Sequence, residues 1–519
     1  MKPRYYIQTY GCQMNVHDSE RMAGMLDDLG YEPTATPEAA DVLLMNTCAV
    51  RERPEHKLYS ELGVLRKLKA TNPDLVIGVA GCMAQREADT IRRRVPEVDI
   101  LLGPRNLHHL PHLLRQTQRR QAARERAEQQ HDIALHEYSS SGDLHEYSSS
   151  GDLPNGIVVT KPGNHLPQKI APSQQANEAA FSDGLDLECD PTPATPVRRR
   201  STISAYVDVI FGCNFNCTYC AVPSARGREV SRKPQEILDE VRQLRDLGYR
   251  EITLLGQTVN AYGHDLERDS SGKRVDFAGL LEDINTIDPT LRVRFTSPHP
   301  MYFNARLIDT IAALPSVCEH LHMPLQSGDN GCLRRMKRTY TVERYREIVE
   351  RVREKMPDVA ITTDLIVGFC GETESEFENT LKAVREIDFD QAYMFAYSPR
   401  HTTEAWLWPD DVPADVKQKR LAELVAVFNH AGREKNRPHV GKTVEVLVEN
   451  LSDKDANRVI GRTRTNKLIV FPGDLDSYPI GSFVEVKTQE AFLWGFRGEV
   501  VRALQPRTPL KTMIELVAA

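Results

Sequence analysis

The sequence lacks the features of a secreted, membrane-spanning or disulfide-stabilised protein. Its first residues, MKPRYYIQTYGC, contain no apolar core of a signal peptide, and no uninterrupted apolar segment approaches the length needed to cross a bilayer. The net charge of −7 gives no overall indication of binding to nucleic acid. Ten cysteines in 519 residues do not resemble the dense disulfide framework of a small secreted domain. We therefore expect a cytoplasmic protein without membrane contact, whose clustered cysteines are metal ligands, catalytic groups or buried packing residues.

A nucleophile elbow is also missing, so the scattered histidines do not indicate a Ser/His/Asp hydrolase. What is present is the composition of an ordinary globular protein, with 40% hydrophobic and 27% charged residues. The chain is long enough for about three domains with cores of their own.

Residues 1–115 alternate between strands and helices. The strand-like runs YYIQTY, DVLLMNT and DLVIGVAG are each followed directly by a cysteine, namely Cys12, Cys48 and Cys82. Alternating strands and helices predict a parallel sheet, in which the carboxyl ends of all strands lie along one edge. Any one of these thiols could be a buried packing residue. Three at the same topological position favour a shared ligand site.

Residues 116–200 are expected to be a disordered or low-complexity insertion or linker. They are rich in Arg, Gln, Ser and Pro and carry no sustained hydrophobic periodicity. They include a tandem repeat of LHEYSSSGD over residues 135–152, too short for a solenoid and interpreted as a tolerated duplication. Its histidines are expected to be solvated, and Cys189 to be incidental.

Two further domains follow the insertion. Residues 201–438 contain six strand candidates separated by helical stretches, which predicts a partial (β/α)6 barrel. Residues 439–504 contain short β-patterned runs broken by Gly, Pro, Asp and Ser, which predicts a small antiparallel β-barrel. Residues 505–519 form a tail. The fold class is therefore α/β, with an N-terminal parallel-sheet domain, a central partial barrel and a C-terminal antiparallel barrel.

The segment FGCNFNCTYC places Cys213, Cys217 and Cys220 in a C-x3-C-x2-C pattern after the first strand of the partial barrel. Three thiolates on one loop can hold three irons of a cubane cluster and leave the fourth open. An open coordination position is typical of a catalytic metal site. Structural zinc usually takes four ligands from paired motifs, and no second pair lies nearby, although a distant His or Cys could complete such a site.

These residues carry a family resemblance. The cysteine motif followed by AVPSARGREVSR resembles the radical S-adenosylmethionine enzymes, in particular the methylthiotransferases, and TYGCQMN, MNTCAVRE and RGREVSR are similar to the MiaB type. HMPLQSGDNGCLRRMKRTYT and TTDLIVGFCGETE resemble further family blocks, with Cys370 where the family usually has proline. The likeness covers nearly the whole chain outside the insertion, and its C-terminal part resembles a TRAM domain.

The resemblance implies two [4Fe-4S] clusters and S-adenosylmethionine as cofactors. Cys213, Cys217 and Cys220 match the ligands of the catalytic cluster that cleaves S-adenosylmethionine to a 5′-deoxyadenosyl radical. Cys12, Cys48 and Cys82 match the ligands of an auxiliary cluster that carries the inserted sulfur. The implied reaction methylthiolates carbon 2 of N6-dimethylallyladenosine at tRNA position 37, with two S-adenosylmethionine molecules per turnover. The implied partners are the anticodon stem-loop of tRNA, an electron donor and a sulfur or cluster-assembly donor, and we expect a monomer.

Other residues are candidates for binding. Tyr219, inside the cysteine loop, and Asp364, at a late strand end, could contact S-adenosylmethionine, or could equally be a packing aromatic and a helix cap. The stretch RVIGRTRTNKL could follow RNA phosphates or form a solvated charged face, and the TRAM resemblance favours RNA. LRRMKR and RGREVSR are weaker phosphate candidates. Cys318, Cys332 and Cys370 are expected to be packing residues, with another role open for Cys370 because it lies on a loop near the expected cofactor face. The basic residues of the stretch are Arg458, Arg462, Arg464 and Lys467.

Two alternatives to this function are open. The same chemistry could act on threonylcarbamoyladenosine in tRNA or on a ribosomal protein aspartate. The chain could also be a non-catalytic iron-sulfur RNA-binding protein, although three-cysteine motifs that leave an iron open argue against it.

Overall fold

The computed structural model describes residues 2–48, 65–138, 196–268 and 274–504, together with residues 63 and 272. It forms two compact units, each considered by itself. The N-terminal unit is Met1–Arg198 with Ser224–Gly227, and the C-terminal unit is Arg199–Pro223 with Arg228–Ala519. Among the described residues, no helix combines the length and apolar character that a bilayer span requires. The tail 505–519 and Cys189 lie outside the described residues.

The N-terminal unit is built on a five-stranded parallel sheet, as the sequence predicts. The strand order is β2-β1-β3-β4-β5, so β1, β3 and β4 lie side by side. The strands are β1 (Arg4–Tyr10), β2 (Glu32–Pro33), β3 (Val42–Thr47), β4 (Val76–Gly81) and β5 (Ile100–Leu102).

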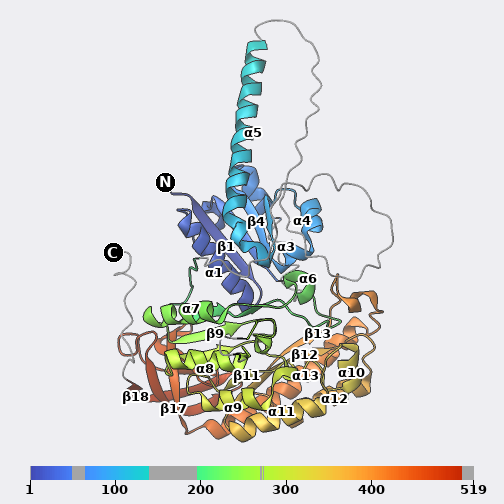
Figure 1. Cartoon of the computed structure of the whole chain (residues 1–519), viewed down its shortest axis with the longest axis vertical. Coiled ribbons are helices and arrows are strands. Elements are labelled where there is room, and N and C mark those ends of the chain that lie inside the picture. Colours follow the sequence, from blue (N-terminus) through green and yellow to red (C-terminus); the bar gives the residue numbers. More distant parts are fainter. Residues whose placement is uncertain are drawn as a thin grey trace. The chain divides into compact units, whose positions relative to one another are not determined.

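Helices cover both faces of this sheet (Figure 1). Along β3, Val42 and Leu44 pack on one face with α1 and α5, and Leu43 and Met45 pack on the other with α4. A central parallel strand buried on both faces accounts for the continuous apolar run VLLM. The helices are α1 (Gln13–Asp28), α3 (Cys82–Arg86), α4 (Ala88–Arg94) and α5 (Leu110–Tyr138), with 3-10 turns η1 (Pro37–Ala39) and η2 (Pro104–His109).

The structure corrects the expectation that disorder begins at residue 116, because α5 continues to Tyr138 (Figure 1). Its first turns are anchored by Leu113 and Leu114, which are buried in the core. The rest of the helix is rich in Arg, Gln, Ala and Glu, all of which have high helix propensity, so a helix forms without an apolar face. At the other end of the expected insertion, Arg198 donates its backbone N–H to Glu20 in α1. Most of the tandem repeat lies outside the described residues.

The C-terminal unit begins with the predicted partial barrel. Two parallel three-stranded sheets, in the orders β6-β9-β10 and β11-β12-β13, are linked through a parallel bridge between Val293 and Val317. All six predicted strands are present, so the (β/α)6 expectation is confirmed. They are β6 (Ser204–Asp208), β9 (Glu251–Leu255), β10 (Arg292–Phe295), β11 (His320–His322), β12 (Ala360–Val367) and β13 (Gln391–Ala396).

Amphipathic helices cover the outside of these strands (Figure 1). Their apolar faces meet inward strand residues such as Leu254, Val293 and Leu365 in one large core. Short elements of this unit include β7 (Ile210–Phe211), β8 (Val230–Ser231) and α10 (Asn330–Arg335). Helix α6 (Val222–Arg226) is shared between the units, because Ser224–Gly227 belongs to the N-terminal unit. The long helices are α7 (Pro234–Asp246), α8 (Phe277–Ile287), α9 (Ala305–Ala313), α11 (Val342–Lys355), α12 (Glu374–Ile387) and α13 (Ala414–Asn436). The 3-10 turns are η3 (Val259–Ala261), η4 (Pro300–Tyr302), η5 (Glu404–Leu407) and η6 (Arg437–His439).

The last strands form a closed barrel in the order β14-β15-β16-β18-β17. The prediction of an antiparallel barrel holds for every neighbouring pair except β16 and β18, which pair in parallel between Leu468–Val470 and Gly495–Arg497. That single parallel pair closes the cylinder. The strands are β14 (Thr443–Ser452), β15 (Asp455–Thr463), β16 (Leu468–Pro472), β17 (Phe483–Phe492) and β18 (Gly495–Leu504).

Two buried arginines of β10 join the small barrel to the partial barrel within the C-terminal unit. Arg292 donates to the carbonyl of Arg462 at 2.8 Å and to the carboxylate of Glu445 at 3.0 Å. Arg294 donates to the carbonyl oxygens of Arg464 and Thr463, both at 2.8 Å. Hydrogen bonds of buried charged donors to fixed carbonyls are strong and directional, so the two barrels are held in a defined arrangement.

Candidate active site

In the N-terminal unit, the three predicted cysteines follow three neighbouring strands at the same level. Tyr10 of β1 pairs laterally with Thr47 of β3, and Thr47 pairs with Gly81 of β4. Cys48 and Cys82 come directly after Thr47 and Gly81, and Cys12 comes two residues after Tyr10. The predicted convergence is therefore present in the structure.

The three thiols are close enough to influence one another electrostatically. A hydrogen bond with Cys48 is the main cause that lowers the pKa of Cys12 to about 6, and the guanidinium of Arg226 acts in the same direction. Burial raises the pKa of Cys82, against the opposing effect of Arg226. Cys48 and Cys82 are buried, whereas Cys12 is half-buried.

Two buried asparagines hold these strand ends together. Asn15 Oδ1 lies 3.3 Å from the backbone nitrogen of Cys12 and 3.4 Å from its sulfur, and accepts from both. Asn15 Nδ2 donates to Asn46 Oδ1 at 3.1 Å, and Asn46 Nδ2 donates back to the carbonyl of Asn15 at 2.8 Å. The sequence motifs GCQMN and MNTC contain both residues, but their role becomes visible only through this long-range pairing.

The glycine before Cys82 has a conformation that its surroundings require. Gly81 has φ of +91°, and a Cβ atom built on it would lie 2.4 Å from Asn46 Oδ1 and from the carbonyl oxygen of Thr47. Only glycine fits this backbone so close to the neighbouring strand. Gly11, before Cys12, is similarly confined, since its Cβ would lie 2.8 Å from the Cβ of Cys48.

Arg226 is a site residue whose position the sequence did not predict. The sequence indicates RGREVSR as a weaker phosphate-binding candidate, but the first residue of this motif, Arg226, is buried and belongs to the N-terminal unit. Its guanidinium donates to Asp18 Oδ2 at 2.7 Å. Burial opposes its charge, but Asp18, Cys82 and Cys12 together raise the pKa of Arg226 well above its usual value. A permanent positive charge therefore lies beside the thiols of Cys12 and Cys82.

In the C-terminal unit, the second cysteine set lies on one loop after β7. The Cys213 sulfur lies 3.3 Å from Thr258 Oγ1, and the backbone N–H of Val222 donates to the Cys220 sulfur at 3.5 Å. Arg338 donates to the Cys217 sulfur at 3.3 Å. Like Arg226, Arg338 places a guanidinium beside a cysteine sulfur, although Arg338 is only partly buried.

The loop is pinned through Thr218, between the second and third cysteines. Its backbone N–H donates to Met336, its hydroxyl donates to the carbonyl of Arg335 at 2.9 Å, and its carbonyl accepts from Ala405 at 2.8 Å. Three hydrogen bonds to two separate segments hold the loop in one conformation.

The electrostatics of this loop suit a cationic metal cluster. Burial raises the pKa of Cys213, and burial followed by the charge of Cys217 raises the pKa of Cys220 to about 12. Buried thiols of this kind become thiolates when bound iron supplies positive charge.

Among the described residues, no three His, Cys, Asp or Glu side chains form a group that could hold a single metal ion.

Nearby polar atoms offer hydrogen bonds to a further ligand. Gln257, just after β9, has both side-chain polar atoms buried without a partner among the residues described here. His299, after β10, stacks on Phe215 of the cysteine loop with ring centroids 4.0 Å apart, and its Nδ1 accepts from the backbone of Met301. Its Nε2 is likewise buried without a partner within the described chain. A zwitterionic cofactor such as S-adenosylmethionine would fit these donors and acceptors.

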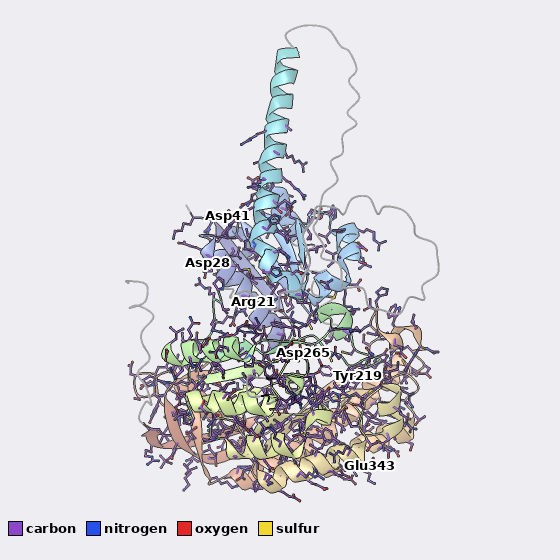
Figure 2. The ribbon with its side chains drawn as sticks, viewed as in Figure 1. Arg21, Asp28, Asp41, Tyr219, Asp265 and Glu343 are labelled. Atoms are coloured by element: carbon purple, nitrogen blue, oxygen red, sulfur yellow. The ribbon has the colours of Figure 1, made fainter. Side chains whose placement is uncertain are left out.

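Tyr219 and Asp364 have structural roles in this arrangement. Tyr219, labelled in Figure 2, meets Phe369 edge to face with centroids 6.4 Å apart, and burial raises its pKa well above the usual value. Asp364 lies on β12, with Oδ2 3.3 Å from Nε2 of His322. Their contact with the cofactor stays a prediction. Cys318, Cys332 and Cys370 are buried, as expected of packing residues.

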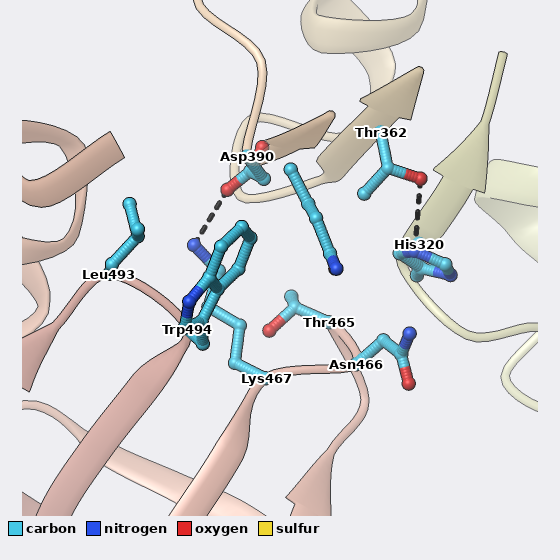
Figure 3. A pocket seen from close by; sticks show the side chains of 9 residues that line it. His320, Thr362, Asp390, Thr465, Asn466, Lys467, Leu493 and Trp494 are labelled. Atoms are coloured by element: carbon cyan, nitrogen blue, oxygen red, sulfur yellow. Dashed lines mark hydrogen bonds and ion pairs between the residues drawn. The ribbon is translucent and has the colours of Figure 1, made fainter. Parts of the chain in front are cut away.

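Basic side chains of the RVIGRTRTNKL stretch in the small barrel form ion pairs within the C-terminal unit. Arg464 forms a bidentate ion pair with Glu319. Lys467 forms an ion pair with Asp390 at 2.7 Å (Figure 3). Lys467 is buried beside a cavity of about 20 Å³, room for a single water molecule. Its contact with an RNA phosphate stays a prediction, which would require Lys467 to leave Asp390.

The other two basic residues of the stretch are more accessible. Arg458 pairs with Asp455 and Arg462 with Glu449, both at 2.9 Å, and all four side chains are partly exposed. A phosphate could compete for either guanidinium. RNA contact stays a prediction for Arg458 and Arg462, as it does for Arg464 and Lys467.

Comparisons with known proteins agree with this geometry. Residues 4–103 match the uncharacterized protein family UPF0004, residues 207–384 the radical SAM superfamily, and residues 437–501 the TRAM domain. The fold and the C-x3-C-x2-C loop thus define a radical S-adenosylmethionine enzyme with an added three-cysteine domain and a TRAM barrel.

Relatives specify the family. Proteins called tRNA-2-methylthio-N(6)-dimethylallyladenosine synthase from Moorella thermoacetica and Carboxydothermus hydrogenoformans are each 42% identical over 96% of this chain, covering 98% and 99% of their own lengths. One from Thermoanaerobacter pseudethanolicus is 41% identical over 96% of this chain and 93% of its own. The chain belongs to the tRNA-2-methylthio-N(6)-dimethylallyladenosine synthase family.

Proposed function

We propose that this enzyme methylthiolates carbon 2 of N6-dimethylallyladenosine at position 37 of tRNA, consuming two S-adenosylmethionine molecules per turnover. The observation that carries the proposal is the presence of two separate sets of three cysteines, one in each unit, in a chain of this family. The first set follows three neighbouring parallel strands and the second lies on one loop after β7, and each set has a guanidinium beside a sulfur.

Each cysteine set would hold one [4Fe-4S] cluster through three thiolates. Cys213, Cys217 and Cys220 would bind the catalytic cluster, and Cys12, Cys48 and Cys82 the auxiliary cluster. Together with S-adenosylmethionine, the bound clusters supply the one-electron chemistry and the sulfur that an unactivated aromatic carbon requires.

The protein's own residues hold and neutralise these groups. Arg338 and Arg226 offset the negative charge of thiolates in a low-dielectric site. Gln257 and His299 would hydrogen-bond the polar groups of the cofactor. Asn15 and Asn46 maintain the spacing of the strand ends that carry the auxiliary thiols.

The partners belong to the same proposal. The substrate is the anticodon stem-loop of tRNA, with the TRAM barrel contributing to its binding. The reaction also needs an electron donor and a sulfur or cluster-assembly donor. We infer that the enzyme acts as a monomer in the cytoplasm, where its tRNA substrate is found.

One experiment tests the assignment directly. The protein is loaded with iron and sulfide without oxygen, then incubated with S-adenosylmethionine, a reductant and prenylated tRNA, and nucleosides are analysed by mass spectrometry. We expect 2-methylthio-N6-dimethylallyladenosine. S-adenosylmethionine cleavage without this nucleoside would refute the substrate, and product from threonylcarbamoyladenosine tRNA or a ribosomal protein would support the alternatives, which the relatives' names do not favour.

A further inference from the structure

A loop after β13 exposes two large apolar residues. Trp406 and Leu407, in η5, have 47% and 81% of their surface exposed. Their neighbour Trp408 instead packs against Phe369, with ring centroids 6.0 Å apart. The loop is therefore anchored by one tryptophan while it presents another apolar pair to solvent. We call residues 400–408 the tryptophan loop.

The tryptophan loop is attached directly to the cysteine loop of the same unit. Ala405, next to Trp406, donates its backbone N–H to the carbonyl of Thr218, between Cys217 and Cys220, at 2.8 Å. Thr402 has φ of +76°, which is a strained conformation for a β-branched residue. Strained backbone in a well-anchored loop is characteristic of binding and catalytic sites.

A basic residue borders the tryptophan loop. Glu404 of the loop forms an ion pair with Lys337, whose side chain is about half exposed. Lys337 follows α10, whose Arg334 is also exposed. Exposed aromatic surface next to flexible cations is the combination that binds unpaired nucleotides, since bases stack on the ring and phosphates meet the charges.

We propose that the tryptophan loop, together with Lys337, binds unpaired nucleotides of the RNA substrate. This rests on the proposed function, which supplies an RNA loop as the partner. The indole of Trp406 stacks on an unpaired base next to the reacting nucleotide, Leu407 extends the apolar surface, and Lys337 exchanges Glu404 for a phosphate. Single-stranded loops suit this surface because their bases can turn out and stack on aromatic rings.

Binding of labelled RNA to the cluster-loaded full-length protein tests the proposal. The probe is a fluorescent anticodon stem-loop with a seven-nucleotide loop, and fluorescence anisotropy gives Kd at constant salt. We expect Trp406→Ala to raise Kd by about 5- to 160-fold, since a stacked base is worth about 1–3 kcal/mol. Trp406→Phe should restore most of the affinity. Thr286→Ala, which truncates an exposed neutral side chain of α8, is the control and should leave Kd unchanged.

Two further measurements separate stacking from general binding. The same stem closed by a compact tetraloop should bind wild type and Trp406→Ala equally. Lys337→Gln should reduce the salt dependence of log Kd by about one phosphate contact. Equal affinity of Trp406→Ala and wild type for the open loop, or equal loss with both RNAs, would overturn the proposal.

Failure of this proposal can be distinguished from failure of the proposed function. A wild-type enzyme that forms no methylthiolated nucleoside refutes the function, whatever Trp406 does. A wild-type enzyme that forms product while Trp406→Ala binds the open loop as tightly refutes only the role of the tryptophan loop. Binding of Trp406 to a protein or to lipid vesicles in place of RNA would refute it as well.

Discussion

Arg226 and Asp18 form a buried ion pair next to the cysteines of the N-terminal unit. Their Nη2 and Oδ2 atoms lie 2.7 Å apart, and only 6% and 1% of the two side chains is exposed. The residues are 208 positions apart in the chain, so the pair joins α1 to the segment that follows the second cysteine motif. It places a guanidinium beside Cys82 and Cys12 while satisfying its charge.

Replacing Arg226 by methionine should destabilise the N-terminal unit strongly. Removal of one partner leaves the other charge buried, which typically costs about 3–5 kcal/mol. The measurement is amide hydrogen exchange of β1, β3 and β4 in the iron-free protein, which reports the stability of this unit separately. The double variant Arg226→Met with Asp18→Leu should recover part of the loss. Additive losses in the double variant would contradict a direct coupling.

Mutations in the two cysteine sets should affect different steps of the reaction. Cys12→Ala should lose methylthio transfer and about half of the bound iron, yet still cleave S-adenosylmethionine, because only the auxiliary cluster loses a ligand. Cys213→Ala should lose cleavage and transfer together. Iron analysis and assay of 5′-deoxyadenosine measure both effects. If Cys12→Ala abolished cleavage, the assignment of the two clusters would be wrong.

Gly81→Ala should impair the auxiliary site through a steric clash. The added Cβ would approach Asn46 Oδ1 and the Thr47 carbonyl to 2.4 Å, so the strand end that carries Cys82 must move. We expect iron loss at this site with S-adenosylmethionine cleavage retained. Gly30→Ala is the control, since Gly30 has a similar φ of +84° but open space around it. Equal iron loss in both variants would indicate backbone strain as the cause rather than the clash.

The contact of Lys467 with Asp390 should make docking of the small barrel pH-dependent. Burial raises the pKa of Asp390, but Lys467 and Lys435 outweigh it and hold the pKa below its usual value. Because the folded pKa lies below the unfolded one, the pair stabilises the unit above the unfolded value of about 4, and this is lost as pH falls through the folded pKa.

Asp390→Asn should therefore destabilise the C-terminal unit at pH 7 by about 3–5 kcal/mol and flatten its acid dependence. Hydrogen exchange of β16 at several pH values measures both effects. Glu490→Gln, which breaks the exposed pair with Arg497, is the control and should cost less than about 1 kcal/mol. A wild-type acid dependence retained in Asp390→Asn would show that other groups cause it.

Much of the architecture was predictable from local patterns. Strand runs followed by Cys12, Cys48 and Cys82 predicted their convergence, because parallel strands place their carboxyl ends on one edge. The C-x3-C-x2-C loop needed only chain connectivity to bring its thiols together. Local patterns were misleading for residues 116–138, which form part of α5. Their lack of hydrophobic periodicity suggested disorder, but their high helix propensity favours a helix.

The sequence by itself determined the strands, the order of the domains and the two sets of three thiols, since each depends on residues close together in the chain or on the rules of a parallel sheet. Only the tertiary structure decided which charges are buried. Arg226 meets Asp18, Arg294 and Arg464 join the two barrels, and Lys467 pairs with Asp390 inside the C-terminal unit. An arginine or lysine has the same place in a local pattern whether it is solvated or buried, and only the distant carboxylate or carbonyl that folding brings to it settles which.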